Sequence, residues 1–208
     1  MQIAVIGTGN VGAALGKRWA EGGHRVVFGT RDPESAKVTA LVEAAGPNAS
    51  ADRIANATAR AEVVLLAVPW DVVRLVLENA GELSGKVLID ATNPIAPAGL
   101  AVGFDTSGGE LVAEWAPGAR VVKAFNTTGA NNLADSRYGD VRPSMFLCGD
   151  DAAAKQIAGE LAGEIGFEAI DAGALSLARV LEPLTVLWVS LAHRQGLGRN
   201  IAFSLLRR

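Results

Sequence analysis

Apolar and polar positions alternate along this chain in blocks that predict strands and helices in regular succession. Short apolar runs bounded by glycine or polar residues are typical of strands buried on both faces of a sheet. The runs that predict strands are Ile3–Ile6, Arg25–Phe28, Val63–Val68, Val87–Ile89, Arg120–Ala124, Ser144–Leu147 and Phe167–Ile170. Between the runs, apolar residues recur every three or four positions, as in Val11, Leu15 and Trp19, and this spacing predicts amphipathic helices.

The helices predicted between these strands complete an α/β pattern. They lie over Asn10–Ala20, a segment after Pro33, a short segment before Val63, Val72–Leu77, Glu110–Trp115, Ala152–Ile165 and an apolar tail from Leu175 that ends at "QGLGRN". Asp32 is expected to cap the helix after it, because proline, here Pro33, is favoured in the first turn of a helix. Strands that alternate with helices predict a Rossmann-type, doubly wound parallel sheet with a small helical C-terminal portion.

The composition narrows the classes of protein and of site. Of the 208 residues, 50% are hydrophobic and 20% are charged, and the net charge is −3, so no surface for nucleic acid or an acidic membrane is expected. The single cysteine, Cys148, excludes an internal disulfide framework and is expected to be buried in its strand. The two histidines, His24 and His193, stand apart from other candidate ligands, so no metal site is expected. No secretory signal is recognised, and the nearest approach to a membrane span, "LTVLWVSLA", is too short, so a cytoplasmic location is expected.

A glycine-rich turn follows the first predicted strand and opens the first predicted helix. It satisfies the pattern G-x-G-x-x-G of dinucleotide-binding turns with the residues Gly7, Thr8, Gly9, Asn10, Val11 and Gly12. In that pattern Gly7 makes the tight turn, Gly9 lets the backbone approach a pyrophosphate, and Gly12 lets helix and strand pack closely. The amides at the helix start favour the diphosphate. The alternative is a purely structural turn.

The second predicted strand ends in Gly29, Thr30 and Arg31, where NAD enzymes place an acid that binds the ribose 2′-hydroxyl. A guanidinium instead binds a 2′-phosphate well, so Thr30 and Arg31 predict selection of NADP(H). Lys37 adds a more distant positive charge. Two alternatives stay open: Asp32 acts as the acid that binds the ribose, or Arg31 is a solvated surface residue. Residues 1–150 are accordingly expected to form an NADP-binding Rossmann domain. Residues 151–208 are expected to add a strand and helices that complete the substrate crevice and provide a dimer contact.

Other strand ends are expected to line the cofactor, since the carboxyl ends of the strands in an open α/β sheet face the ligand. These residues are Val68, Pro69, Trp70, Asn93, Ala124, Asn126 and Thr128. Trp70 fits a cofactor rim and ordinary packing equally well. The polar groups after Ala124 suit a nicotinamide carboxamide, or hydrogen bonds within their own loop. No catalytic acid–base pair is recognised, and hydride transfer requires none, because proximity and orientation carry it.

The chain resembles the F420-dependent NADP reductases and their bacterial dinucleotide-binding relatives over essentially its whole length. The resemblance rests on "IAVIGTGNVGAALGKRWAEGGHRVVFGTRDP", "LLAVPW", "VVKAFNT" and "DAGALSLARVLEPLTVLWVSLA". "VVKAFN" also occurs in the cytoplasmic reductase domain of membrane metalloreductases. The resemblance implies a homodimer that passes hydride between NADP(H) and the deazaflavin ring of coenzyme F420, with F420 as a substrate.

The resemblance also implies roles for individual residues. Thr8, Thr30 and Arg31 match the family's phosphate contacts, and Pro69 and Trp70 match its nucleotide-side rim. Asn126 and Thr128 stand where archaeal members have histidine and isoleucine. That departure leaves open a flavin, a quinone or a ferric chelate as the acceptor.

Two further functions stay open at this point. A reductase of a small carbonyl or imine would require a separate helical substrate domain and an acid, for which Lys123 is the only candidate nearby. A non-catalytic NADP(H)-binding redox sensor would require neither. The apolar segment "LEPLTVLWVSLA" fits a dimer interface or another partner surface.

Overall fold

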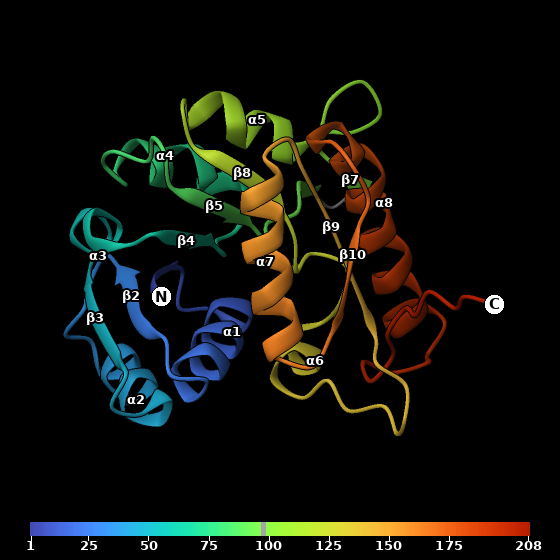
Figure 1. Ribbon diagram of the computed structural model, residues 1–208, viewed down its shortest axis with the longest axis horizontal. Helices are drawn as coiled ribbons and strands as arrows, with labels where there is room; N and C mark the ends of the chain where they lie inside the picture. The colour runs from blue at the N-terminus through green and yellow to red at the C-terminus, as the bar shows by residue number, and fades with distance from the viewer. Residues whose placement is uncertain (97–98) are drawn as a thin grey trace.

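An eight-stranded sheet runs through the computed structural model, which describes residues 1–96 and 99–208 (Figure 1). Its strands are β1 Gln2–Ile6, β2 Arg25–Thr30, β3 Ala49–Arg53, β4 Val63–Leu66, β5 Val87–Asp90, β8 Arg120–Lys123, β9 Ser144–Gly149 and β10 Glu168–Asp171. Their order across the sheet is β10-β9-β8-β5-β4-β1-β2-β3. A separate antiparallel pair is formed by β6 (Ile95–Ala96) and β7 (Gly99–Leu100).

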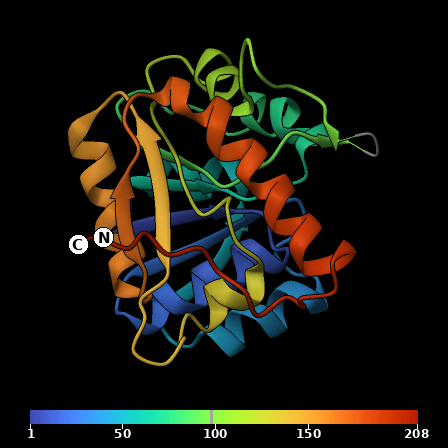
Figure 2. The same cartoon turned by 90° about the vertical axis from the view of Figure 1, so that its right-hand side faces the viewer.

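Helices cover both faces of this sheet. They are α1 Asn10–Glu21, α2 Ala36–Ala45, α3 Ile54–Arg60, α4 Val73–Glu78, α5 Gly108–Trp115, α6 Ala130–Ala134, α7 Ala152–Glu164 and α8 Ala178–Val189. One core contains residues of α1, α2, α6 and α7, and the core on the other face contains residues of α3, α4 and α5. Figure 2 shows α8 running obliquely across the β9 side of the molecule.

The strand order confirms the predicted Rossmann-type fold. The six strands β3-β2-β1-β4-β5-β8 are parallel, and their order reverses between β1 and β4. Open α/β sheets bind ligands at the carboxyl ends of the strands beside such a reversal. Within this mostly parallel sheet, β9 runs antiparallel to β8, and β10 runs parallel to β9. Because β10 pairs with β9, the segment 151–208 extends the same sheet.

The central strand β1 explains why a short apolar run predicts a buried strand. Ile3 and Val5 enter the core on one face, and Ala4 and Ile6 enter the core on the other. All four are fully buried. Successive side chains of a strand point to opposite faces, so a run without polar residues requires cover on both.

The C-terminal helical segment is longer than its pattern indicated. Leu175–Arg194 form 20 consecutive helical residues, and an 18-residue window within them has a mean hydropathy of 1.5, so the segment is long and apolar enough to cross a membrane by length and composition alone. The prediction that no stretch reaches that length is therefore wrong. One side of α8 packs on the domain, with Ala178, Leu181 and Trp188 buried.

Cys148 is buried in β9 against this helix, as predicted. Its Sγ donates a hydrogen bond to the carbonyl oxygen of Leu175 at 3.7 Å. Burial raises the pKa of the thiol to about 12, so Cys148 stays protonated at neutral pH.

Three local predictions differ from the structure. β3, α6 and the β6–β7 pair were not predicted, because segments such as "ASADR" in β3 are polar and only partly buried at the edge of the sheet. Asp32 is not the cap of α2, which begins at Ala36 with Ser35 as its N-cap residue. The Ser35 hydroxyl donates to the Asp32 carbonyl oxygen at 2.9 Å, so Pro33 lies in a turn before the helix and not in its first turn.

Candidate functional site

The turn between β1 and α1 requires glycine at two positions. Gly7 has a φ of +112°, and a Cβ on it would lie 2.2 Å from the carbonyl oxygen of Ala67. A Cβ on Gly12 would lie 2.0 Å from the carbonyl oxygen of Gly7. Neither position can accept a side chain without moving the backbone. Gly7 therefore allows the tight turn, and Gly12 allows α1 to pack closely on that turn.

Gly9 lies in open surroundings at the start of α1. No heavy atom of the described residues comes within 4 Å of the position that its Cβ would take. Gly9 is the N-cap residue of α1, which has neither a side-chain cap nor an acidic residue in its first turn. Amides in a first helical turn lack partners within the helix and carry the positive end of its dipole. This end of α1 is therefore accessible to an anion, and Thr8, Asn10 and Val11 lie partly or fully exposed beside it.

The carboxyl end of β2 lies beside this turn, and the Gly7 amide donates to the Gly29 carbonyl oxygen at 3.4 Å. Thr30 is half-buried as the last residue of β2, and Arg31 after it is exposed. Lys37 is exposed in α2. Among residues 1–96 and 99–208, the ion pairs include neither Arg31 nor Lys37. Their charges are therefore available to an anion at this strand end.

The segment after β4 forms the next wall. Val68 packs against the glycine turn, with its Cγ1 3.1 Å from the Cβ position of Gly7, and Pro69 is exposed. The ring centroid of Trp70 lies 5.6 Å from that of Trp115, with 33° between the ring planes. The packing role of Trp70 is therefore confirmed, and its role as a cofactor rim remains a prediction.

Polar side chains at the ends of β5 and β8 meet in one hydrogen-bond network. Asn93 Nδ2 donates to the Asn126 carbonyl oxygen at 3.2 Å, and Asn126 Nδ2 donates to Asn93 Oδ1 at 3.1 Å. Thr185 of α8 joins them, since its hydroxyl donates to the Asn126 carbonyl oxygen at 2.7 Å. Thr128 Oγ1 accepts from Asn132 Nδ2 at 2.9 Å, and Ala124 is buried. Hydrogen bonding within the loop is therefore found for Thr128, whereas Asn126 is bonded to the segment after β5 and to α8.

One acceptor in this network lacks a partner. Asn126 is 2% exposed, and no described residue donates to its Oδ1. The residue before it, Phe125, has a φ of +62°, which strains a bulky side chain. Phe125 packs edge-to-face on Trp19 of α1, with ring centroids 5.6 Å apart. Packing on α1 thus holds the strained turn that carries Asn126.

Lys123 lies in a buried ion cluster and is not an accessible acid. Its Nζ donates to Asp90 Oδ2 at 2.9 Å and to the Thr92 carbonyl oxygen at 2.7 Å, and lies 2.9 Å from Glu182 Oε1. The side chains of Lys123, Asp90 and Glu182 are at most 1% exposed. Burial opposes the charged form of Lys123, but the two carboxylates outweigh it and raise the pKa of this amine above its usual value.

Glu182 extends this cluster to two further elements. Its carboxylate accepts from the amides of Gly108 and Gly109 at 3.0 and 2.9 Å, at the start of α5. Those amides lack partners within α5 and favour a negative charge. Glu182 therefore ties α8 to α5 as well as to Lys123 at the end of β8.

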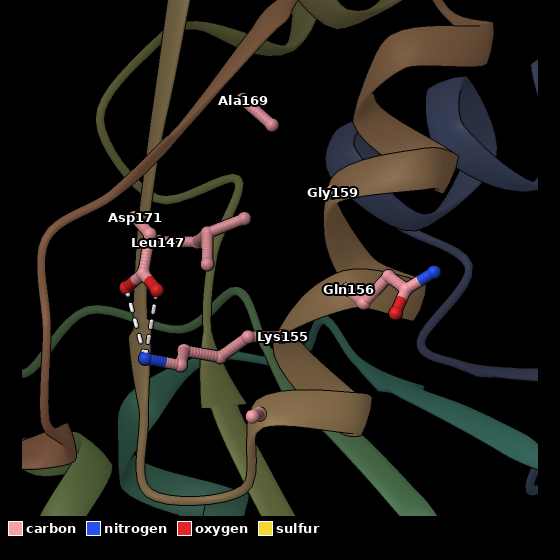
Figure 3. A pocket seen from close by; sticks show the side chains of 7 residues that line it. Leu147, Lys155, Gln156, Gly159, Ala169 and Asp171 are labelled. Atoms are coloured by element: carbon pink, nitrogen blue, oxygen red, sulfur yellow. Dashed lines mark hydrogen bonds and ion pairs between the residues drawn. The ribbon is translucent and has the colours of Figure 1, made fainter.

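Neither of two surface depressions on the molecule contains a predicted cofactor residue. The first, of about 280 Å³, lies between α7 and the β9–β10 edge (Figure 3) and is lined by Leu147, Ala152, Lys155, Gln156, Gly159, Ala169 and Asp171. Its charges neutralise each other, since Lys155 Nζ lies 3.0 and 2.8 Å from the two oxygens of Asp171. The second, of about 290 Å³, is lined by Ala113, Ala119, Arg120, Val121, Asp150, Asp151 and Leu175.

Sequence reasoning did not identify the two residues of α8, Glu182 and Thr185, that lie at the strand ends. Glu182 reaches Lys123 at the end of β8, and Thr185 reaches Asn126 after β8 and Asn93 after β5. The one acidic residue in the largely apolar "ARVLEPLTVLWV" was the signal, because a charge on an apolar helix face requires a buried partner.

The family described as "NADP oxidoreductase coenzyme F420-dependent" matches residues 2–94. The F420-dependent NADP reductase of Methanothermobacter marburgensis is 38% identical, with 92% of each chain covered. A crystal structure of a putative F420-dependent NADP reductase from Arthrobacter sp. FB24 superposes with a TM-score of 0.91, at 33% identity and with both chains fully covered. The metalloreductase STEAP3 of Rattus norvegicus is 31% identical over 88% of this chain, which spans 36% of that protein.

Proposed function

This chain belongs to the F420-dependent NADP reductase family, and on that premise we propose that it transfers a hydride between NADP(H) and coenzyme F420 or a similar acceptor. The observation that carries the proposal is the start of α1 at Gly9, which has no side-chain cap, next to Arg31 after β2, which forms no ion pair among the described residues. A pyrophosphate and a 2′-phosphate are the anions that these two groups suit.

The residues present fit NADP(H). Because Gly9 has no Cβ, the space beside it is free. A pyrophosphate in that space would be held by the amides at the start of α1. Thr30 and Arg31 would hold the 2′-phosphate. The unpartnered Oδ1 of Asn126 is an acceptor for an amide N–H, which the nicotinamide carboxamide provides.

The hydride transfer requires orientation, and the proton that the reduced deazaflavin also takes up comes from water in this proposal, so no acid of the protein is required. Bound NADP(H) supplies or accepts the hydride at its nicotinamide ring. The Asn93–Asn126–Thr185 network would form the wall beside that ring, and the buried Lys123 cluster holds α8 against the same strand ends. Placing two flat rings in contact then provides most of the catalysis.

A direct assay tests this function. The protein is mixed with NADPH and, in separate reactions, with F420, FMN or a ferric chelate, while the nicotinamide absorbance is followed. Oxidation of NADPH with F420 alone is the expected result. Tight NADPH binding without turnover of any acceptor would instead indicate the redox sensor.

A flavin, quinone or ferric reductase is the second candidate. It is favoured by Asn126 and Thr128, which depart from the residues of archaeal reductases, and by the match to a metalloreductase. Oxidation of NADPH with FMN or the chelate, and not with F420, would support it. A carbonyl or imine reductase is disfavoured, because Lys123, its candidate acid, is fully buried.

Replacing Arg31 with alanine should raise the Michaelis constant for NADPH far more than that for NADH. The guanidinium would contact only the phosphate that distinguishes the two nucleotides, and a charge-assisted contact of this kind is worth about tenfold in affinity. Steady-state kinetics with both nucleotides measure the effect. Equal changes for NADPH and NADH would contradict the assignment of Arg31.

We further propose a homodimer in the cytoplasm, with α8 in the interface. Leu177, Val180 and Leu187 are 36%, 59% and 48% exposed and lie at spacings of three and seven residues, on one side of the helix. An exposed apolar stripe of this kind suits a second helix.

Replacing Leu187 with glutamate should convert the dimer to a monomer, because the interface would then bury two uncompensated charges. Sedimentation at micromolar concentration measures the change. Glutamate at Leu75, which is 60% exposed on α4, is the matched control and should leave the dimer intact. A monomeric native protein would contradict the proposal.

A further inference from the structure

Arg53 lies next to the arginine expected to bind the 2′-phosphate, although the two are far apart in the sequence. It is the last residue of β3, and its Cα pairs with that of Thr30 in the parallel register of β2 and β3. Its Nη1 donates to the carbonyl oxygen of Arg31 at 3.5 Å. The guanidinium of Arg53 thus reaches the end of β2 from the neighbouring strand.

The close approach of these segments depends on Gly29. The Cβ that Gly29 lacks would lie 3.4 Å from the Cα of Ile54 and 3.4 Å from the Cβ of Ala57. Ile54 is the first residue of α3 and follows Arg53 directly. A glycine in β2 therefore lets the start of α3 pack on the strand, and Arg53 lies at that contact.

The positive charge of Arg53 is unused within the described residues. Its side chain is exposed, and the ion pairs of residues 1–96 and 99–208 include neither Arg53 nor Arg31. The neighbouring carboxylate of Asp52 is neutralised elsewhere. It accepts from Asn56 Nδ2 at 2.9 Å and from Arg60 Nη2 at 2.6 Å, both on α3.

We propose that Arg53 is a second specificity-determining residue for NADP(H), binding the 2′-phosphate together with Arg31. A phosphomonoester carries up to two negative charges and three acceptor oxygens, which two guanidinium groups satisfy better than one. Arg53 belongs to an edge strand, whereas Thr8, Thr30 and Arg31 lie on the glycine turn and at the end of β2. The proposal rests on the proposed NADP(H) site, because it assumes that the ribose lies at the end of β2.

Equilibrium titration of the full chain with NADPH and with NADH tests this role without any acceptor. Replacing Arg53 with alanine should weaken NADPH binding about tenfold and change NADH binding less than about twofold. Replacing it with lysine should recover part of the loss, since lysine keeps the charge without the planar fork. Arg25→Ala is the matched control, because Arg25 is an exposed arginine at the opposite end of β2.

The outcomes separate this inference from the proposed function. If Arg31→Ala lowers NADPH affinity selectively and Arg53→Ala does not, Arg53 has no such role and the NADP(H) site stands. Equal weakening of NADPH and NADH by Arg53→Ala would also overturn the inference, since it would indicate a structural effect. If the native protein binds neither nucleotide, the proposed function fails, and this inference fails with it.

Discussion

Replacing Lys123 with methionine is expected to lower the free energy of unfolding by about 3–5 kcal/mol. The substitution keeps most of the side-chain volume but removes the cation that lies between two buried carboxylates, Asp90 and Glu182, each 2.9 Å from Nζ. The Thr92 carbonyl oxygen loses its donor as well. A buried charge without a partner lowers the free energy of unfolding by far more than a complete buried ion pair raises it. Chemical denaturation of the variant and the native protein measures the difference.

Two further variants control for side effects of this change. Lys17→Met removes an exposed lysine whose ion pair with Glu21 is 3.8 Å long, and it should change stability by less than about 0.5 kcal/mol. Adding Glu182→Gln to Lys123→Met should cost less than the sum of the two single changes, because the double variant buries one charge fewer. If the effects of the two substitutions on the free energy of unfolding are fully additive, Lys123 and Glu182 do not interact. A Lys123→Met variant as stable as the native protein would also contradict the prediction.

Replacing Gly9 with alanine is expected to weaken NADPH binding by about 10- to 100-fold while leaving the fold unchanged. The backbone of Gly9, with φ −81° and ψ −174°, suits any residue, and its Cβ would meet no described atom within 4 Å. The added methyl group would instead occupy the space through which a pyrophosphate approaches the helix start. Overpacking of this kind costs about 1–3 kcal/mol, which corresponds to the stated loss in affinity. Thermal unfolding and NADPH titration of the same sample separate the two effects.

Gly12→Ala provides the contrasting case within the same turn. Its Cβ would lie 2.0 Å from the carbonyl oxygen of Gly7, so the variant should lose stability as well as binding. Gly163→Ala in α7, where the Cβ meets open space, should be at least as stable as the native protein. Unchanged NADPH affinity in Gly9→Ala would contradict the assignment of the pyrophosphate to this turn.

Features that depend on neighbouring residues in the sequence were predicted well. The β1–turn–α1 unit follows from an apolar strand, three glycines and one helical stripe, all within the first 21 residues. The position of Arg31 follows from the end of the next strand. Central strands such as β4 are apolar because the sheet is covered on both faces, so composition alone indicates them.

Features that depend on distant pairing were not predictable in the same way. Edge strand β3 is polar, so Arg53 could not be placed beside Thr30 without the register of β2 and β3. Lys123 looked like an accessible acid at a strand end, because its partner Glu182 lies 59 residues later in the sequence. Asp32 was favoured as a cap by the following proline, whereas the chain makes one more turn before Ser35. The positions of Arg53 and Lys123 depend on long-range contacts, and that of Asp32 depends on an extra turn.

The two sides of α8 connect the proposed nucleotide site to the proposed dimer interface. One side carries Glu182 and Thr185 into the wall at the strand ends, and the other exposes Val180 and Leu187. α8 lies within 20 continuous helical residues and moves as one rigid element, so a tilt imposed on its outer side also displaces its inner side. In the proposed dimer, self-association and nucleotide affinity are therefore linked equilibria: the factor by which dilution changes the affinity for NADPH equals the factor by which NADPH changes self-association.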